Sequence, residues 1–204
     1  MQKIWSRLES WFAEHHPDLS LDLRPGATAN ELEAAEQALG VKLPEDFRAS
    51  VRVHDGQLDE PKVQLFPYAQ RLNSLASLVR CWQDDRPNFH EQDLAERLTW
   101  LDDGQRVRQV HLHPQRVPFA GSPNWDYDQL LFDCIPGPDG VAGQVIARSD
   151  IDLGFVCQSF GELLSRTAQG LEDGTIIVTP SDSAHELSYR SKRKKPLRPG
   201  DYFA

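Results

Sequence analysis

The sequence predicts an α+β protein with a mainly antiparallel sheet, because its helix-like and strand-like segments are grouped along the chain. Amphipathic helical patterns come first, short strand-like runs cluster between residues 107 and 157, and one more helix follows. A doubly wound parallel fold would instead alternate strands and helices. A length of 204 residues suits a single domain, since domains typically contain roughly 100–200 residues.

Three helices are predicted before residue 54. The first covers residues 3–14, where apolar residues recur at helical spacing: Ile4, Trp5, Leu8, Trp11 and Phe12. The second follows Thr28, which forms a capping-box pattern with Glu31, and it ends at Gly40. The third begins at Pro44, where a first-turn proline loses no hydrogen bond, and runs to about Val53.

The middle of the chain mixes both kinds of element. Residues 62–68 predict a short strand. A helix is then indicated by the spacing of Leu72, Leu75, Leu78, Val79 and Trp82, with Asn73 or Ser74 as its cap. Another helix is indicated by Leu94, Leu98 and Leu101.

The second half predicts the sheet, through runs at 107–112, 116–120, 129–135, 144–147 and 155–157. The segment 136–140, Pro-Gly-Pro-Asp-Gly, is a strong turn signal between two of them. Ser159 then caps a closing helix with inward-facing Phe160, Leu163, Leu164 and Leu171, and residues 175–179 predict a late strand. We therefore expect one domain over residues 1–180 and a polar, basic tail over 181–204.

The formal charge of −9 is unevenly distributed. Residues 190–204 hold six basic residues and one acidic residue, a sum of +5, so the rest of the chain carries −14. Such an acidic body repels nucleic acid and attracts basic partners, although negative charge also simply keeps a protein soluble. The basic run Lys192–Lys195 is typical of a nuclear import signal, a phosphate-binding arm or a solubilising tail.

The compartment predicted from the sequence is the cytoplasm. Three cysteines without a CxxC pair indicate reduced thiols, and Cys81 and Cys157 lie in apolar surroundings that predict burial. The N-terminal residues mix charges every few positions, unlike a secretory signal, and no run reaches the roughly 18 apolar residues of a membrane span.

Catalytic signatures are missing from the sequence: it contains no GxSxG, P-loop, HExxH or paired CxxC pattern. His111 and His113 would share one face of a strand, a spacing that suits zinc. With Asp126 and Asp128 nearby, a metal-dependent hydrolase using these acids and His113 stays as one alternative. We expect no catalytic residue, no metal and no cofactor.

The loop Trp125-Asp126-Tyr127-Asp128 has three interpretations. It is a turn into the following strand, a patch of exposed aromatic and acidic residues that binds a basic protein, or an acid/base pair. Its spacing does not match a calcium loop, because the glycine needed for the sharp turn is missing.

Several ordered segments together resemble the SUKH superfamily, the group of Smi/Knr-type cell-wall assembly regulators and bacterial immunity proteins. They are Leu43-Pro44-Glu45-Asp46-Phe47, His54-Asp55-Gly56-Gln57, Gln129-Leu130-Leu131-Phe132-Asp133, Gly143-Gln144-Val145-Ile146 and Ser159-Phe160-Gly161-Glu162-Leu163-Leu164. The loop at 124–128 departs from the pattern, since relatives often have a glycine there, and the basic tail lies outside the resemblance.

The resemblance implies a curved, largely antiparallel sheet packed by helices, and a binding scaffold without shared catalytic apparatus. Our leading hypothesis from the sequence is a cytoplasmic immunity protein that neutralises a cognate toxin, for instance a basic nuclease. The alternative is a regulatory interaction scaffold in cell-wall biogenesis. Both require a protein partner, and neither requires nucleic acid or a membrane. The partner-binding patch predicted for either role combines six residues: Asp55, Gln57, Trp125, Asp126, Tyr127 and Asp128.

Overall fold

The computed structural model describes residues 1–67, 70–89, 105–121, 128–149, 153–181 and 184–190, and the structural statements below concern this part of the chain. Its helices are α1 (Gln2–His15), α2 (Ala29–Leu39), α3 (Glu45–Val51), α4 (Leu75–Asp85), the 3-10 helix η1 (Arg86–Asn88) and α5 (Phe160–Asp173). Its strands are β1 (Val63–Gln64), β2 (Arg71–Leu72), β3 (Arg116–Gly121), β4 (Gln129–Asp133), β5 (Gln144–Arg148), β6 (Leu153–Cys157), β7 (Ile176–Pro180) and β8 (His185–Tyr189).

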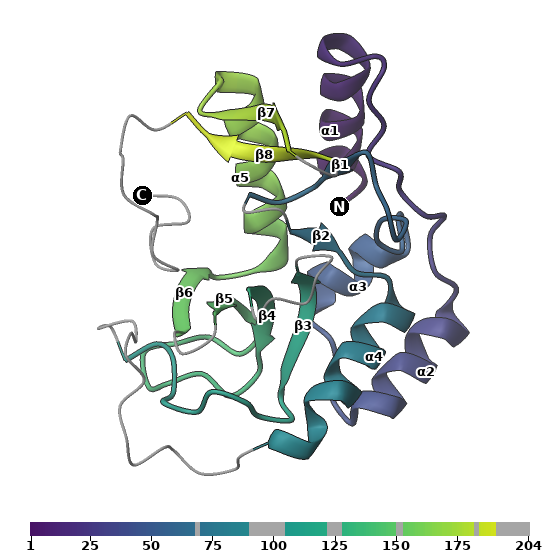
Figure 1. The fold of residues 1–204 in the computed structure, drawn as a ribbon. Coiled ribbons are helices and arrows are strands. Elements are labelled where there is room, and N and C mark those ends of the chain that lie inside the picture. The colour runs from purple at the N-terminus through teal and green to yellow at the C-terminus, as the bar shows by residue number, and fades with distance from the viewer. Residues whose placement is uncertain (68–69, 90–104, 122–127, 150–152, 182–183, 191–204) are drawn as a thin grey trace.

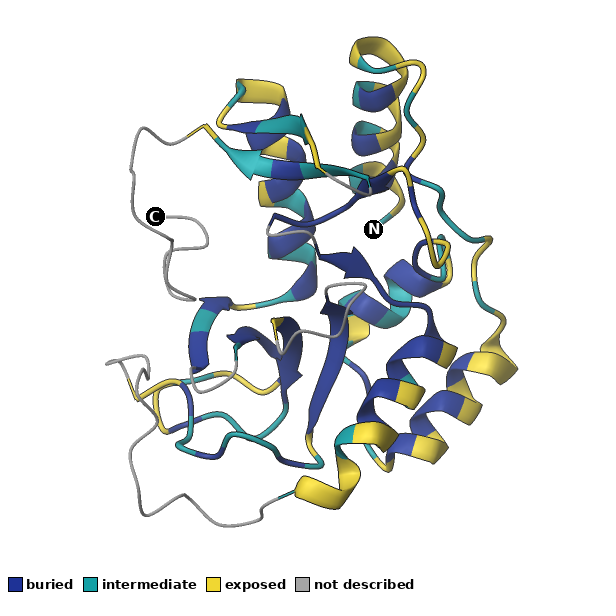
Figure 2. Cartoon of the chain, viewed as in Figure 1, coloured by how far each residue is buried: buried dark blue, intermediate teal, exposed yellow. Residues whose placement is uncertain are grey.

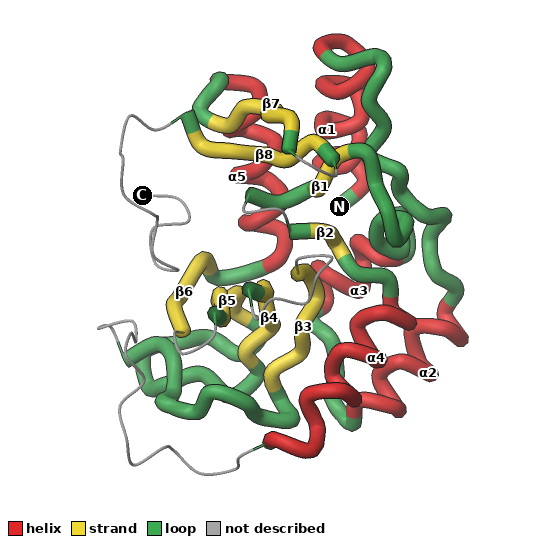
Figure 3. The backbone as a smooth tube through the Cα atoms, in the orientation of Figure 1, coloured by secondary structure: helices red, strands yellow, loops and turns green. Residues whose placement is uncertain are grey.

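The strands form two sheets, and α5 contacts both of them (Figure 3). The larger sheet has the order β2-β3-β4-β5-β6, and all of its neighbouring strands are antiparallel. The smaller has the order β1-β8-β7, in which β1 and β8 are parallel. The helix α4 contacts β3, and α2 lies beside α4 on the side away from the sheet (Figure 1). This arrangement confirms the predicted α+β class with a mainly antiparallel sheet.

An aromatic cluster joins the larger sheet to the helices. Phe119 of β3 and Phe132 of β4 stack with ring centroids 4.2 Å apart. Phe47 of α3 lies 4.7 Å from Phe132, and Phe160 of α5 lies 5.1 Å from Phe47. Trp5 of α1 is fully buried, and its indole N–H donates to the Ser50 hydroxyl at 2.9 Å. Burial of such large rings dominates core energetics, so these residues hold the helices on the sheet.

The opposite face of the larger sheet is also buried over β3, β4 and β5, which are dark along their whole length in Figure 2. A buried ion pair, Arg116 Nε to Asp133 Oδ1 at 3.2 Å, crosses from β3 to β4 on this face. Gln144 of β5 donates to the other carboxylate oxygen at 3.0 Å. Polar groups this deep are tolerated only when they are paired.

Residues 105–115 pack against this face as an irregular segment, which corrects the strand predicted at 107–112. Their backbone carbonyls bond to side chains of the sheet: Arg108 accepts from Arg116 at 2.9 Å, and Arg106 accepts from Gln144 at 2.8 Å. Val107 meanwhile packs on Leu131. The apolar residues that suggested a strand are thus explained by packing on the sheet surface, and no strand of the described chain pairs with this segment.

Most predicted helix boundaries are confirmed within a residue or two. The Thr28–Glu31 capping box is formed, with Gly40 in the left-handed conformation after α2. Ser159 caps α5, and Ser74 rather than Asn73 caps α4. The helix predicted around residues 94–101 lies outside the described residues.

Other parts of the prediction differ from the structure. Leu72, which was grouped with the helix, belongs to β2 and pairs with Ala120, while the helix begins at Leu75, directly after the predicted Ser74 cap. The strand predicted at 62–68 shortens to the two residues of β1. The strand β8 was not predicted, and the boundary at residue 180 falls between β7 and β8, whose Leu187 is fully buried. The fold therefore continues at least to Tyr189, while the division into a domain and a tail stays a prediction.

Candidate protein-binding surface

The structure describes three of the six residues predicted to bind a partner. Asp55 and Gln57 follow α3 in the loop 54–57, and exposed Asp128 immediately precedes β4. Trp125, Asp126 and Tyr127 lie outside the described residues. Whether the two loops form one surface therefore stays a prediction.

Gln57 organises the fold around it. Its side-chain amide donates to the carbonyls of Leu21 and Val63, both at 2.7 Å, and its oxygen accepts from the backbone N–H groups of Leu65 and Leu72, both at 3.1 Å. Only 1% of its surface is exposed. All the hydrogen-bonding capacity of this amide is used inside the protein. Gln57 therefore has no side-chain surface to offer a partner in this structure, and we remove it from the predicted patch.

Asp55 caps a helix from a distant part of the chain. Its carboxylate accepts from the backbone N–H of Leu75, the first residue of α4, at 2.8 Å. The pKa of Asp55 is raised, mainly because its side chain is half-buried. The hydrogen bond from Leu75 lowers this pKa, nearby Glu31 raises it further, and Arg24 lowers it. Two acidic residues thus stand at the positive ends of α2 and α4, where helix dipoles favour negative charge.

The raised pKa of Asp55 gives a pH-dependent prediction. The pKa of this carboxyl is 3.8 in the unfolded chain and higher in the folded protein. The ionised side chain therefore lowers the stability of the fold as the pH rises through these two pKa values. Asp55→Asn keeps an oxygen that accepts from Leu75 without the charge. We expect this variant to equal or exceed the parent in urea stability at pH 7, by less than about 1 kcal/mol because the group is half exposed, and to lose that advantage at pH 3.

The control for this prediction is Asp18→Asn, at an exposed residue after α1. It should leave the pH profile of unfolding unchanged. If Asp55→Asn is instead the less stable protein at pH 7, the charge is required for the cap.

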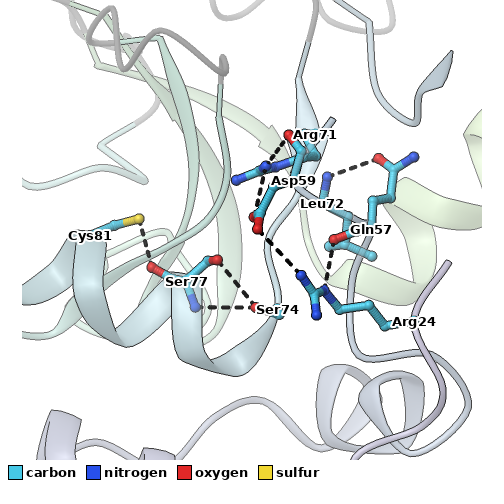
Figure 4. Close-up of polar contacts among 8 residues, drawn as sticks. All are labelled: Arg24, Gln57, Asp59, Arg71, Leu72, Ser74, Ser77 and Cys81. Atoms are coloured by element: carbon cyan, nitrogen blue, oxygen red, sulfur yellow. Dashed lines mark hydrogen bonds and ion pairs between the residues drawn. The ribbon is translucent and has the colours of Figure 1, made fainter. Parts of the chain in front are cut away.

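An ion cluster next to this loop was missed by the sequence analysis (Figure 4). The Asp59 carboxylate lies 3.2 Å from Arg71 Nη1 and 3.5 Å from Arg24 Nη2. Arg24 also donates to the Gln57 carbonyl at 3.2 Å. The cluster ties the chain before α2 to β2, and only its acidic member is well exposed, with 68% of the Asp59 side chain accessible.

Exposed residues follow directly in the chain. Leu58 is 46% exposed and is followed by the exposed Asp59 and Glu60. The two exposed carboxylates favour contact with a basic protein through complementary charge, and the exposed leucine adds apolar surface beside them. Neither periodicity nor turn signals in the sequence indicate that this segment is an exposed surface. The only signal that could have shown it was one apolar residue among polar ones.

The described residues do not form the zinc site that the spacing of His111 and His113 suggested. His111 Nε2 lies 3.0 Å from the Ser149 carbonyl, and His113 Nδ1 accepts from the Gln115 N–H at 3.1 Å. Within the described ranges, no three His, Cys, Asp or Glu side chains are grouped to hold a metal ion. The hydrolase alternative also used Asp126, which lies outside these ranges.

The cysteines are free thiols. Burial raises the pKa of Cys81 and Cys157 to about 12 and that of Cys134 to about 11. Thiols with such values stay protonated at neutral pH and are poor nucleophiles. Burial of Cys81 and Cys157, predicted from their apolar neighbours, is confirmed.

Comparison with known proteins identifies the family. The family model described as SMI1 / KNR4 (SUKH-1) matches residues 26–166, a stretch that contains the entire larger sheet and the first half of α5. The chain belongs to the SMI1/KNR4 family. The resemblance noted in the sequence is thereby confirmed.

Several relatives of this SUKH-1 chain are fungal proteins. It is 25% identical over 98% of its length to the glucan synthesis regulatory protein of Neurospora crassa, and 27% identical over 98% to the cell wall assembly regulator SMI1 of Saccharomyces cerevisiae. It is 27% identical over 96% to the cell wall biosynthesis/cell cycle regulator smi1 of Schizosaccharomyces pombe. The chain spans 43%, 46% and 41% of these relatives, respectively. A 57-residue stretch is 39% identical to human F-box only protein 3, over 28% of the chain and 12% of that protein.

Within the described residues, no helix combines the length and apolar character that crossing a membrane requires.

Proposed function

We propose that this SUKH-1 chain is a non-catalytic interaction domain that binds a positively charged protein as part of a regulatory scaffold. The observation that carries the proposal is its similarity, over nearly the whole chain, to proteins named as regulators of cell-wall assembly and glucan synthesis. A domain that binds other proteins would suit such a regulatory role. The compartment we propose is the cytoplasm.

Charge supports the choice of a basic partner. Residues 1–189 carry −14, and the exposed segment after Gln57 adds Asp59 and Glu60 to half-buried Asp55. Complementary charge accelerates encounter and selects partners by sign, and the interaction weakens as salt screens it. The same charge disfavours a nucleic-acid partner.

The test begins with co-purification from native cells and mass spectrometry of the retained protein. Its affinity for the purified domain is then measured by calorimetry at low and high salt. We expect weaker binding at high salt, and a loss of at least about tenfold in the double variant Trp125→Ala, Asp126→Ala, because aromatic anchors dominate interfaces. The control is Val141→Ala, at an apolar residue that is 55% exposed.

Two results would contradict the proposal. Affinity that does not change with salt would remove the electrostatic argument. A double variant that binds as tightly as the control would remove the loop 125–128 from the binding surface.

A second candidate function is neutralisation of a toxin, favoured by the same −14 charge, because an acidic inhibitor would occlude the phosphate-binding cleft of a basic nuclease. Co-expression with a toxin encoded next to its gene tests this candidate. Restored growth supports an immunity role, whereas unaltered toxicity leaves the regulatory scaffold as the function to pursue.

A further inference from the structure

A pocket lies between α1 and the extended segment that follows it. Its volume is about 390 Å³, and its walls come from the second half of α1, from residues 17–23 and from His54. Figure 1 shows this segment leaving the end of α1 and running along the side of the molecule towards α2. Most of the lining is apolar, with buried Phe12 and Leu21 and half-buried Leu19 and Leu23. The pocket therefore offers an apolar surface large enough for an extended side chain.

The charged residues that line this pocket are both acidic, Glu9 and Asp22. Two other pockets within the described residues differ: one is lined by Lys3 and Arg7 with two glutamates, and the other includes Arg190. Asp59 and Glu60 are balanced by Arg24 and Lys62, so the net negative charge of this region comes from Glu9 and Asp22 in the pocket itself. A ligand that combines a positively charged group with an apolar stem would match both the acidic and the apolar parts of this lining.

Both carboxylates are held by the fold. Glu9 Oε1 lies 3.3 Å from His54 Nε2, and the His54 ring is packed edge-on against buried Trp5 at 5.1 Å. Asp22 has a left-handed backbone, with φ of 48°, and its carboxylate accepts from the Lys62 N–H at 2.7 Å. A non-glycine residue in this conformation is uncommon and strained, so the surrounding contacts must hold it there. Carboxylates held in place lose little freedom when they bind a cation.

Asp22 also connects the pocket to the exposed Leu58. The Asp22 carbonyl accepts from the Leu58 N–H at 2.8 Å, which fixes the exposed leucine beside the acidic residue. One partner segment would therefore contact an apolar residue and a pocket with acidic walls at neighbouring positions.

We propose that this pocket binds the side chain of an arginine or lysine from a basic segment of the partner protein, a proposal that rests on the function proposed above. The aliphatic stem lies over the half-buried Leu19 and Leu23, and the charged head is placed between Glu9 and Asp22. Long basic side chains bury their stems on apolar surface while keeping the head paired or wet. Charge-assisted hydrogen bonds to carboxylates are about twice as strong as hydrogen bonds between neutral groups. Arginine is also enriched in interface hot spots.

The test uses the full chain, labelled with 15N, and the synthetic peptide acetyl-Gly-Arg-Leu-Arg-Gly-amide. We expect saturable shifts of the backbone amides of Leu19, Leu23 and Leu58 in two-dimensional NMR spectra. The peptide with citrulline in place of both arginines keeps the shape without the charge, and it should bind at least about tenfold more weakly.

Matched variants locate the binding. Glu9→Gln and Asp22→Asn remove the charges while keeping oxygens that face His54 and the Lys62 N–H, and asparagine tolerates the left-handed backbone. The double variant should lose at least about tenfold in peptide affinity. The control, Glu33→Gln on the exposed face of α2, removes the same charge elsewhere and should bind like the parent.

Three outcomes would overturn the inference: absence of peptide binding, shifts that map away from residues 19–23 and 58, or a double variant that binds like the Glu33→Gln control. The proposed function fails separately, if no protein is retained in the co-purification. A retained partner that binds the double variant with parental affinity refutes the pocket alone.

Discussion

Replacing Asp133 with asparagine is expected to lower the free energy of unfolding by about 3–5 kcal/mol, the usual cost of leaving a buried charge without its partner. Asp133 is fully buried, and its carboxylate contacts Arg116 Nε at 3.2 Å and Gln144 Nε2 at 3.0 Å. The substitution keeps the size of the side chain but removes its charge. Burial already lowers the pKa of Arg116, and the nearby carboxylate opposes this effect.

If Asp133 is replaced by a neutral residue, no other carboxylate in the described contacts balances the positive charge of Arg116. Its side chain is 1% exposed, Nη2 donates to the Arg108 carbonyl, and Nη1 has no hydrogen-bond partner. Urea unfolding followed by tryptophan fluorescence measures the loss. Asp139→Asn, in the exposed turn after β4, is the matched control and should change stability by less than about 0.5 kcal/mol. Similar losses in the two variants would mean that the ion pair does not stabilise the sheet.

Gly56→Ala is expected to cost about 3 kcal/mol or more, because it combines backbone strain with a steric overlap. Gly56 has φ of +74°, and a Cβ atom there would lie 2.5 Å from the backbone carbon of Asn73 and the backbone nitrogen of Ser74. The overlapping atoms belong to backbone at the start of α4, so they cannot rotate away as a side chain would. A shift there would also displace the hydrogen bond from Leu75 to Asp55.

Gly40→Ala separates the two contributions to this loss. Gly40 has φ of +66°, but a Cβ atom there would meet nothing within 4 Å. Strain alone predicts a loss of about 1–2 kcal/mol at this position. Thermal unfolding followed by circular dichroism compares the two proteins, and equal shifts in Tm would show that the contact between Gly56 and the start of α4 has no effect.

Local signals predicted the helices well because each helix end is decided by residues a few positions apart. The capping box of α2 and the Ser159 cap of α5 are bonds between a side chain and a backbone N–H three residues later. The turn at 136–140 is likewise local, and it connects β4 with β5 as expected. The predicted fold class followed from the order of these segments.

Predictions failed where a segment's partner lies far away in the sequence. Residues 107–112 look like a strand because their apolar residues meet the sheet, yet their carbonyls bond to Arg116 and Gln144 side chains. The strand β2 was hidden inside a helical pattern, because Leu72 is buried for its position in the sheet. The strand β8 carries few apolar residues and is recognisable only through its pairing with β1 and β7.

The candidate binding surface also depends partly on local sequence signals and partly on long-range contacts. The sequence by itself determined the acidic charge, the loop at 54–57, the family resemblance and the helix caps, since all of these depend on residue type and short spacing. Only the tertiary structure decided that Gln57 is enclosed by four backbone partners while Leu58 and Asp59 are exposed, and that Glu9 and Asp22 line one pocket. The physical reason is that burial and pairing are decided by segments tens of residues apart, and spacing along the chain does not encode which of them meet.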